Sequence, residues 1–257
     1  MRSKDVQPSM NETGTPINLE VYSQDSNELF TRNDKVNLVG KLAAGVAHEI
    51  RNPLTTIKGF VQLLDMGVSK PEYFSIINSE LNRVEEIIDK LKGLAEPSSI
   101  KFHPNDIRLV LEQAIMQLKE LCLSKGIEIA TTIEAVTSII FSDGEQLKQV
   151  FVNVIKNAIE ATAPNKKLFI SCTEIDHQFL ITIRDQGVGI SQERISHLFE
   201  PFYCIKENGT GLGLMVSYKI IKEHQGTIHI ESETGVGTTV AISLPLLTQR
   251  RAFQPEN

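Results

Sequence analysis

The chain has 257 residues, of which 41% are hydrophobic, and a formal net charge of −6. This length allows one or two globular domains, and the absence of a basic run argues against nucleic-acid binding. The three cysteines lack the spacing of a metal site or a disulfide framework, and no apolar run reaches the ~18 residues of a membrane span. A cytoplasmic protein is therefore expected.

Residues 1–33 are expected to be a flexible tail or the remnant of a linker. They are rich in polar residues and hold few apolar side chains, so they cannot bury enough surface to fold alone. Residues 249–257, at the other end, are expected to be a second tail.

The first helix is predicted to run from about Lys35 to Met66. Its apolar residues recur at alternating steps of three and four, which is the heptad pattern of a coiled-coil seam. Asn33 or Asp34 is the expected N-cap, and Gly67 is expected to end the helix.

The second helix is predicted to follow after a short loop. Ser69-Lys70-Pro71-Glu72 fits a capping box, and the three–four spacing continues from Phe74 to Ala95. The two helices should form an antiparallel hairpin over residues 34–98, and one hairpin cannot cover both seams. We therefore expect a homodimer, in which two hairpins form a four-helix bundle. The alternative is a lone hairpin packed on the C-terminal domain.

A polar group lies on the outer face of the first helix. His48 falls at heptad position f, away from the seam, so its imidazole should be in water. Glu49 is its neighbour, and Asn52 lies one turn further on the same face. Pro53 removes a backbone N–H and should bend the helix. Taken alone, this segment fits a catalytic histidine and an ordinary surface histidine about equally.

Residues 99–248 mix helical and strand patterns. Asn105 and Asp143 are the expected N-caps of two helices. The predicted helices are 106–118, 145–162 and 212–224, the last ended by Gly226, and the predicted strands are 127–133, 138–141, 168–175, 179–184, 227–233 and 238–244. Because hairpins and helices are interspersed, we expect a two-layer α/β sandwich with a mixed sheet, and an α+β fold for the whole chain.

One helix of this region carries Asn153, Lys156 and Asn157 on one face. Two carboxamide oxygens and an ammonium group suit a hard cation that carries phosphates. A polar helix face in water is the alternative interpretation.

Two glycine motifs follow. Asp185-Gln186-Gly187-Val188-Gly189 comes directly after a strand, where the carboxylate can accept a hydrogen bond from an exocyclic amine and the glycines admit a flat ring. Gly209-Thr210-Gly211-Leu212-Gly213-Leu214 opens a helix, whose free N–H groups attract phosphate. An ordinary turn and a flexible loop are the alternatives. Leu198 to Tyr203, between the motifs, would anchor a mobile lid.

Together these motifs resemble those of bacterial two-component sensor histidine kinases. His48-Glu49-x-x-Asn52-Pro53 is similar to the phosphoacceptor box of that family. Asn153-x-x-Lys156-Asn157, Asp185-x-Gly187-x-Gly189, Phe199-Glu200-Pro201-Phe202 and Gly209-Thr210-Gly211-Leu212-Gly213-Leu214 look like the N, G1, F and G2 boxes of its ATP-binding domain. The residues within these boxes look most like those of the sporulation-type kinases of spore-forming bacilli.

The resemblance implies a role for each matching residue. His48 would be the phosphoacceptor, Glu49 its general base, and Asn52 the residue that positions water when a regulator is dephosphorylated. ATP and Mg²⁺ would bind the C-terminal domain. Asn157 would coordinate Mg²⁺, Asn153 and Lys156 would contact phosphates, and Asp185 would accept a hydrogen bond from the adenine amine. The base pocket would be shaped by Gly187 and Gly189, and the lid and phosphate site would be formed by Gly209, Thr210, Gly211, Leu212 and Gly213. Cys204 and Ile205 stand where the family often has two threonines, whereas Lys206 is kept.

The implied function is autophosphorylation of His48 by ATP, followed by transfer to an aspartate of a response regulator receiver domain. Regulator phosphatase activity and a proteinaceous inhibitor that binds the helical bundle are further implications. Two other functions remain open from the residues alone. One is an ATPase or Ser/Thr protein kinase of the same ATP fold, and the other is a non-catalytic module that binds regulators.

Overall fold

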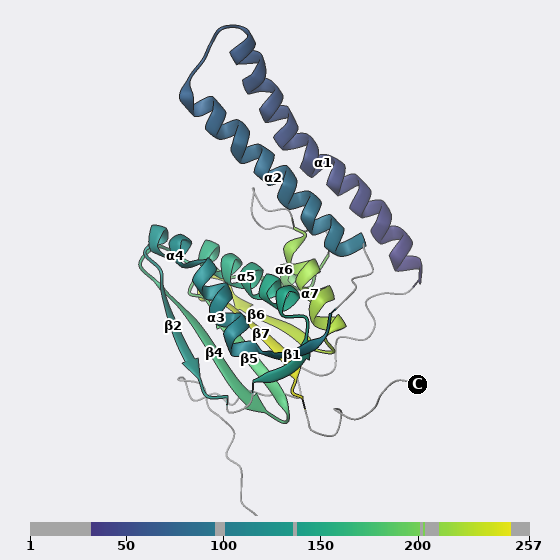
Figure 1. The fold of residues 1–257 in the computed structure, drawn as a ribbon, viewed down its shortest axis with the longest axis vertical. Coiled ribbons are helices and arrows are strands. Elements are labelled where there is room, and N and C mark those ends of the chain that lie inside the picture. The colour runs from purple at the N-terminus through teal and green to yellow at the C-terminus, as the bar shows by residue number, and fades with distance from the viewer. Residues whose placement is uncertain (1–31, 96–100, 136–137, 201–202, 204–210, 248–257) are drawn as a thin grey trace, which may run out of the picture.

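The computed structural model describes residues 32–95, 101–135, 138–200, 203 and 211–247 (Figure 1). The two predicted tails lie almost wholly outside these residues. A long helical hairpin is followed by a unit in which helices cover one face of a sheet, so the predicted fold class is confirmed.

The hairpin consists of α1 (Arg32–Asp65) and α2 (Pro71–Ala95). Because α1 already begins at Arg32, the prediction that Asn33 or Asp34 caps it was wrong. Gly67 lies just beyond α1 with φ of +80°, a backbone conformation that glycine adopts without strain. Helix α2 begins at Pro71, where proline is favoured because the first helical N–H needs no partner. The capping box with Ser69 as N-cap is therefore one residue out of register.

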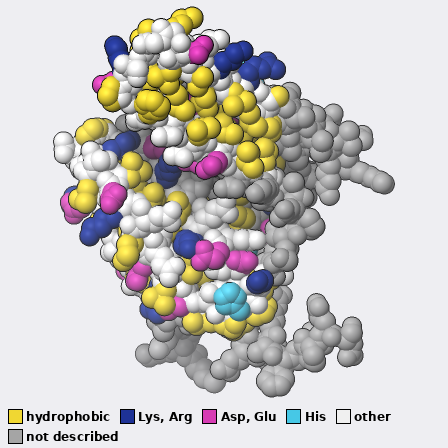
Figure 2. Space-filling view, turned by 45° about the horizontal axis from the view of Figure 1, so that its top comes forward, with side chains coloured by type: hydrophobic (Ala, Val, Ile, Leu, Met, Phe, Trp, Pro, Cys, Tyr) yellow, Lys and Arg dark blue, Asp and Glu magenta, His cyan; other side chains and the backbone are white. Residues whose placement is uncertain are grey.

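Packing within the hairpin leaves much of the predicted seam uncovered. Phe60 and Tyr73 pack with ring centroids 5.0 Å apart, and Pro53 and Ile87 are buried. Other apolar side chains, which recur every seven residues on each helix, remain between 41% and 55% exposed: Leu54 and Val61 on α1, and Phe74, Leu81 and Ile88 on α2. We call these five residues the exposed seam. Figure 2 shows hydrophobic side chains gathered over this part of the molecule.

The second unit is the predicted two-layer sandwich with a mixed sheet. Its described strands run in the order β2-β4-β5-β7-β6, with β2 parallel to β4 and the other neighbours antiparallel. The strands are β2 (Glu128–Ile133), β4 (Lys167–Ile175), β5 (Gln178–Arg184), β6 (Thr227–Glu233) and β7 (Gly237–Pro245). A separate pair, β1 (His103–Asp106) and β3 (Ile139–Ser142), is antiparallel; β1 was not predicted.

The helices of this unit are α3 (Ile107–Gln117), α4 (Lys119–Lys125), α5 (Gly144–Ala161), α6 (Gln192–Ile195) and α7 (Gly213–Glu223). Helices α3, α5 and α7 lie side by side over the sheet (Figure 1). The core between the layers is apolar on both sides; its fully buried members include Leu147, Phe151, Ile155, Leu168, Ile181 and Ile242. Burying a side chain of this size typically contributes about 1.5–3 kcal/mol.

The caps of this unit differ in part from the prediction. Asp143 caps α5 as expected, since its carboxylate accepts a hydrogen bond from the Gln146 N–H. Asp106, not Asn105, caps α3, because Asn105 lies in β1 and donates instead to the Ser142 carbonyl at 2.8 Å. Gln225 takes the left-handed conformation after α7, with φ of +57°. Gly226 is required for another reason: a Cβ there would lie 2.5 Å from the Ser243 carbonyl oxygen.

A buried histidine joins three segments of this unit. His224, 3% exposed, donates from Nδ1 to the Ile220 carbonyl at 2.8 Å and accepts at Nε2 from the Asp143 N–H at 3.0 Å. Its ring also packs edge-on against Phe102, which follows the hairpin in the chain. These contacts require a neutral imidazole, and burial lowers the pKa of His224 below its usual value.

We expect this histidine to make the second unit less stable in acid. Because the pKa of His224 is lower in the folded state, the unfolded chain binds more protons below about pH 6.5, and the free energy of unfolding falls by up to about 1.4 kcal/mol per pH unit there. His224→Gln, which cannot titrate, should flatten this loss in urea unfolding between about pH 7.5 and pH 5.5. His177→Asn, in an exposed turn, is the control. An equally steep loss in His224→Gln would contradict the assignment.

Within the described ranges, every helix is too short or too polar to span a lipid bilayer.

Candidate functional site

The phosphoacceptor candidate lies on the outer side of α1. His48 is exposed, as its heptad position predicts, and Asn52 is exposed one turn further along. Glu49 is partly buried, and its Oε2 lies 3.8 Å from Nη2 of Arg83 on α2. The hairpin therefore presents the imidazole to solvent while it turns the neighbouring carboxylate toward the second helix.

Helix α1 continues through Pro53, which is buried. The hydroxyls of Thr55 and Thr56 donate to the carbonyls of Arg51 and Asn52, at 2.8 and 3.3 Å. Such bonds to the preceding turn tend to bend a helix, as does proline. The turn after His48 thus carries two features that favour a local bend.

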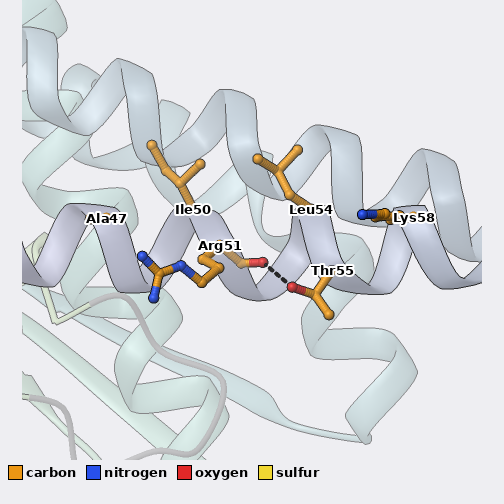
Figure 3. Close-up of a pocket in the computed structure, with 6 residues that line it drawn as sticks. All are labelled: Ala47, Ile50, Arg51, Leu54, Thr55 and Lys58. Carbon is orange, nitrogen blue, oxygen red and sulfur yellow. Dashed lines mark hydrogen bonds between the residues drawn. The ribbon is translucent and has the colours of Figure 1, made fainter.

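A shallow hollow of about 380 Å³ lies along α1 beside His48. Figure 3 shows Ile50 and Leu54 on one side of the helix and Arg51 on the other. The residues that line the hollow are Ala47, Ile50, Arg51, Leu54, Thr55 and Lys58. The hollow therefore combines two cations with part of the exposed seam.

The predicted phosphate-binding face of α5 packs against α7. Asn153 Nδ2 donates to Ser217 Oγ at 2.9 Å. A Cβ at Gly213 would lie 2.3 Å from Asn153 Oδ1, so the start of α7 approaches Asn153 as closely as only glycine permits. Lys156 is exposed and Asn157 partly buried on the same helix. Two sequence motifs that lie 60 residues apart by number (153 and 213) are thus brought into contact.

Asp185 follows the end of β5 and is 5% exposed. Its Oδ1 accepts hydrogen bonds from the backbone N–H groups of Gly187, at 2.8 Å, and Thr238, at 3.1 Å. These two donors fix the orientation of the carboxylate. An oriented, buried acceptor is what recognition of an exocyclic amine requires.

The glycines around Asp185 are needed for close backbone approach. A Cβ at Gly187 would lie 2.5 Å from the Ala161 carbonyl oxygen, and one at Gly189, whose φ is +67°, would lie 2.0 Å from that of Glu233. Because both clashes are with backbone, no side-chain movement could relieve them. The motif is therefore a compact loop held against α5 and β6, with glycines where the backbones meet.

Three contributors to this site were missed from the sequence: Ser217, Ser232 and Thr238. Ser232 Oγ accepts from the Ile190 N–H at 2.8 Å and donates to the Gly237 carbonyl at 2.8 Å. Ser217 follows Gly213 by four residues, a spacing that could have placed it on the same helix face. The N–H of Thr238 carries no sequence signal, because any residue but proline supplies one.

The predicted lid is described only in part. Lys206, Gly209 and Thr210 lie outside the described residues. Gly211 has φ of +63°, and Leu212 is fully buried. Phe199 packs against Tyr218 of α7 with ring centroids 5.0 Å apart, which ties the F-box end of the lid to that helix.

The nucleotide motifs and the hairpin meet through α7. This helix, which starts at Gly213, contacts α2, and Figure 1 shows α7 near the lower part of the hairpin. No group of three or more His, Cys, Asp or Glu side chains in the described part of the chain could hold a metal ion by itself. A cation here would take its ligands from Asn157 and from nucleotide phosphates, which fits Mg²⁺.

Two family profiles match the chain. Residues 38–99 match the His Kinase A (phospho-acceptor) domain, and residues 142–248 match the histidine kinase-, DNA gyrase B-, and HSP90-like ATPase. The first match contains His48, and the second contains Asn153, Asp185 and Gly213.

Similar proteins include two from Bacillus subtilis (strain 168). Sporulation kinase E is 41% identical over 238 residues, which cover 90% of this chain and 32% of that protein. Sporulation kinase A is 43% identical over 225 residues, 86% of this chain and 37% of that protein. The chain thus spans about a third of the length of these relatives.

Solved structures of histidine kinases are also similar to this chain. Histidine kinase ThkA in complex with response regulator protein TrrA superposes with a TM-score of 0.72 at 26% identity, covering 94% of this chain and 74% of that one. The Acinetobacter baumannii histidine kinase AdeS shares the fold, with a TM-score of 0.67 at 24% identity over 78% of this chain and 98% of that one.

Proposed function

Since this chain belongs to the histidine kinase family, we propose that it transfers the γ-phosphoryl group of ATP to its own His48 and then to an aspartate of a response regulator. The observation that carries the proposal is the exposed imidazole of His48, on the same chain as a buried, oriented Asp185 and the glycine-bordered contact between α5 and α7. The proposed acceptor and the proposed nucleotide-binding residues thus belong to one chain.

The proposed roles are those that the resemblance to the family implies. A neutral ring nitrogen of His48 attacks the phosphorus atom. Glu49 holds the proton on the other ring nitrogen as general base. Asn52 positions water when the regulator is dephosphorylated.

At the nucleotide, Asp185 accepts from the adenine amine, with Gly187 and Gly189 beside the base. Asn153, Lys156 and the backbone from Gly209 to Gly213 contact phosphates, together with Lys206. Mg²⁺, held by Asn157, would neutralise charge on those phosphates. We assign residues 34–98 to dimerisation and phosphotransfer and residues 99–248 to ATP binding.

We also propose that the chain acts as a homodimer. The exposed seam, Leu54, Val61, Phe74, Leu81 and Ile88, repeats every seven residues on two helices and remains 41–55% exposed in a single copy. Four seams of this kind bury one another in a four-helix bundle. Exposed apolar stripes of this extent are otherwise unfavourable in water.

The proposed partner is the receiver domain of a response regulator. The similarity to ThkA, which was solved in complex with a response regulator, supports this class of partner. The hollow beside His48, with Arg51 and Lys58, is a suitable place for an acidic phosphoacceptor pocket. A proteinaceous inhibitor could bind the same bundle. The proposed setting is the cytoplasm, which supplies ATP and keeps thiols reduced.

The proposal is tested with purified chain, Mg²⁺ and γ-labelled ATP. We expect a label on the chain that is lost in acid and stable in base, and that passes to receiver domains from a panel. An acid-stable label would instead indicate a Ser/Thr kinase. Hydrolysis of ATP without a label would indicate a plain ATPase. Neither label nor stabilisation by an ATP analogue would indicate a non-catalytic module.

A further inference from the structure

Ser232 lies on β6 at a position where the strand pattern favours an apolar side chain. Alternate residues of a strand face the same side of a sheet, and Ile228 and Ile230, which precede Ser232 at steps of two, are buried in the core. Ser232 is itself only 9% exposed. A buried hydroxyl is unfavourable unless its donor and acceptor groups are paired. The partners of this side chain therefore indicate what the hydroxyl does.

Among the described residues, the Ser232 hydroxyl makes three hydrogen bonds. Its Oγ accepts from the Ile190 N–H at 2.8 Å and donates to the Gly237 carbonyl at 2.8 Å. It also lies 2.9 Å from Oγ1 of Thr238. A hydroxyl carries one proton, and Ser232 donates that proton to Gly237, so Thr238 is the donor of the third bond. The hydroxyl thus uses its proton and both of its lone pairs.

The two segments that Ser232 joins are those that orient Asp185. One is the loop 187–190, in which the N–H of Gly187 donates to Asp185 Oδ1 at 2.8 Å. The other is the start of β7, where the N–H of Thr238 donates to the same oxygen at 3.1 Å. The hydroxyl of Ser232 therefore links the segments that supply both of these donors.

The loop 187–190 also has backbone contacts with the turn between β6 and β7. The N–H of Gly235 donates to the Val188 carbonyl at 2.8 Å, and Gly189 packs so closely that a Cβ there would lie 2.0 Å from the Glu233 carbonyl oxygen. These contacts do not depend on the hydroxyl of Ser232. Loss of that hydroxyl should therefore leave the loop attached but free its buried end to shift against β7.

We propose that Ser232 is a positioning residue for recognition of the adenine base: its hydroxyl fixes the two N–H donors relative to each other, and so orients the Asp185 carboxylate. This inference rests on the function proposed above, in which Asp185 accepts a hydrogen bond from the adenine amine. A hydrogen bond weakens steeply as its angle departs from linear, so a carboxylate that is free to turn discriminates less for the amine. Ser232 acts through Asp185 and not by contact with the nucleotide.

The test compares the affinities of the purified chain for ADP and IDP, each with Mg²⁺, by titration calorimetry. IDP carries a carbonyl where ADP carries the amine, so the ratio of the two affinities reports on recognition of the amine. We expect Ser232→Ala to weaken binding of ADP by about 5- to 10-fold and binding of IDP by less than about twofold. Ser232→Thr, which keeps the hydroxyl, should restore most of the wild-type ratio.

Ser142→Ala is the matched control, because Ser142 is a fully buried serine in β3, which belongs to the separate two-stranded sheet. This variant also loses a buried hydroxyl, but it should keep the wild-type ratio. Equal weakening of ADP and IDP binding in Ser232→Ala overturns the inference, and so does a wild type that binds both nucleotides equally. If Ser232→Ala does not fold by circular dichroism, Ser232→Cys, which keeps the volume but forms weak hydrogen bonds, replaces it. A wild type that binds neither nucleotide would refute the proposed function instead.

Discussion

Replacing His48 with glutamine is expected to abolish the acid-labile, base-stable phosphoryl label. Glutamine occupies a similar volume on the exposed face of α1, but its amide nitrogen is not nucleophilic. Affinity for ATP should stay within about twofold of the wild type, because the nucleotide motifs lie on α5, the loop after β5 and α7. The measurement is incorporation from γ-labelled ATP, together with binding of a non-hydrolysable analogue.

His103→Gln is the control for this experiment, since His103 is an exposed histidine in β1 of the other unit. It should label as the wild type does. Label that survives in His48→Gln would move the acceptor to another residue. Loss of nucleotide binding in His48→Gln would mean that the substitution acts through folding and not through chemistry.

Replacing Asp185 with asparagine is expected to weaken ATP binding by about 10- to 100-fold, which corresponds to the 1.5–3 kcal/mol of a hydrogen bond to a charged group. The asparagine carbonyl can still accept from the N–H groups of Gly187 and Thr238, so the loop should keep its shape. The amide NH₂, however, would face the adenine amine as a second donor. Titration with an ATP analogue measures the affinity directly.

The matched control is Asp176→Asn, at an exposed turn where the residue has φ of +50°, a conformation that asparagine tolerates. Its affinity for ATP should equal that of the wild type. Wild-type affinity in Asp185→Asn would remove Asp185 from the nucleotide site. If Asp185→Asn lowers the melting temperature, and the free energy of unfolding falls by as much as the free energy of ATP binding, Asp185 has a structural role only.

Local patterns predicted most of the helices and strands, because these depend on spacing along the chain, but they did not predict β1, α4 or α6. The three–four repeat placed α1 and α2, and Asp143 marked the start of α5 correctly. The cap of α3 was misplaced by one residue because the side chain of Asn105 donates a hydrogen bond to the Ser142 carbonyl, 37 residues away in number, and no local pattern reports that contact. The prediction of a helix cap fails where a strand distant in the chain binds the same side chain.

Part of the candidate site could likewise be predicted from the sequence, and part could not. Its chemistry was visible in the sequence, because His48, Asp185 and the glycine motifs are recognisable by residue type and order. The support for that chemistry was not visible, since Thr238 holds Asp185 through a backbone N–H and Ser217 reaches Asn153 from another helix. Which apolar residues face a second copy was also open, because a heptad repeat does not say which seam positions the hairpin covers itself.

The sequence by itself therefore determined the family, the order of most elements and the residues able to react, since these follow from residue type and periodic spacing. Only the tertiary structure decided that Arg83 faces Glu49, that Asn153 closes on Gly213, and that the exposed seam remains open to a partner. The physical reason is that these contacts join segments distant in the chain, and their energies depend on burial and distance, which a linear pattern does not contain.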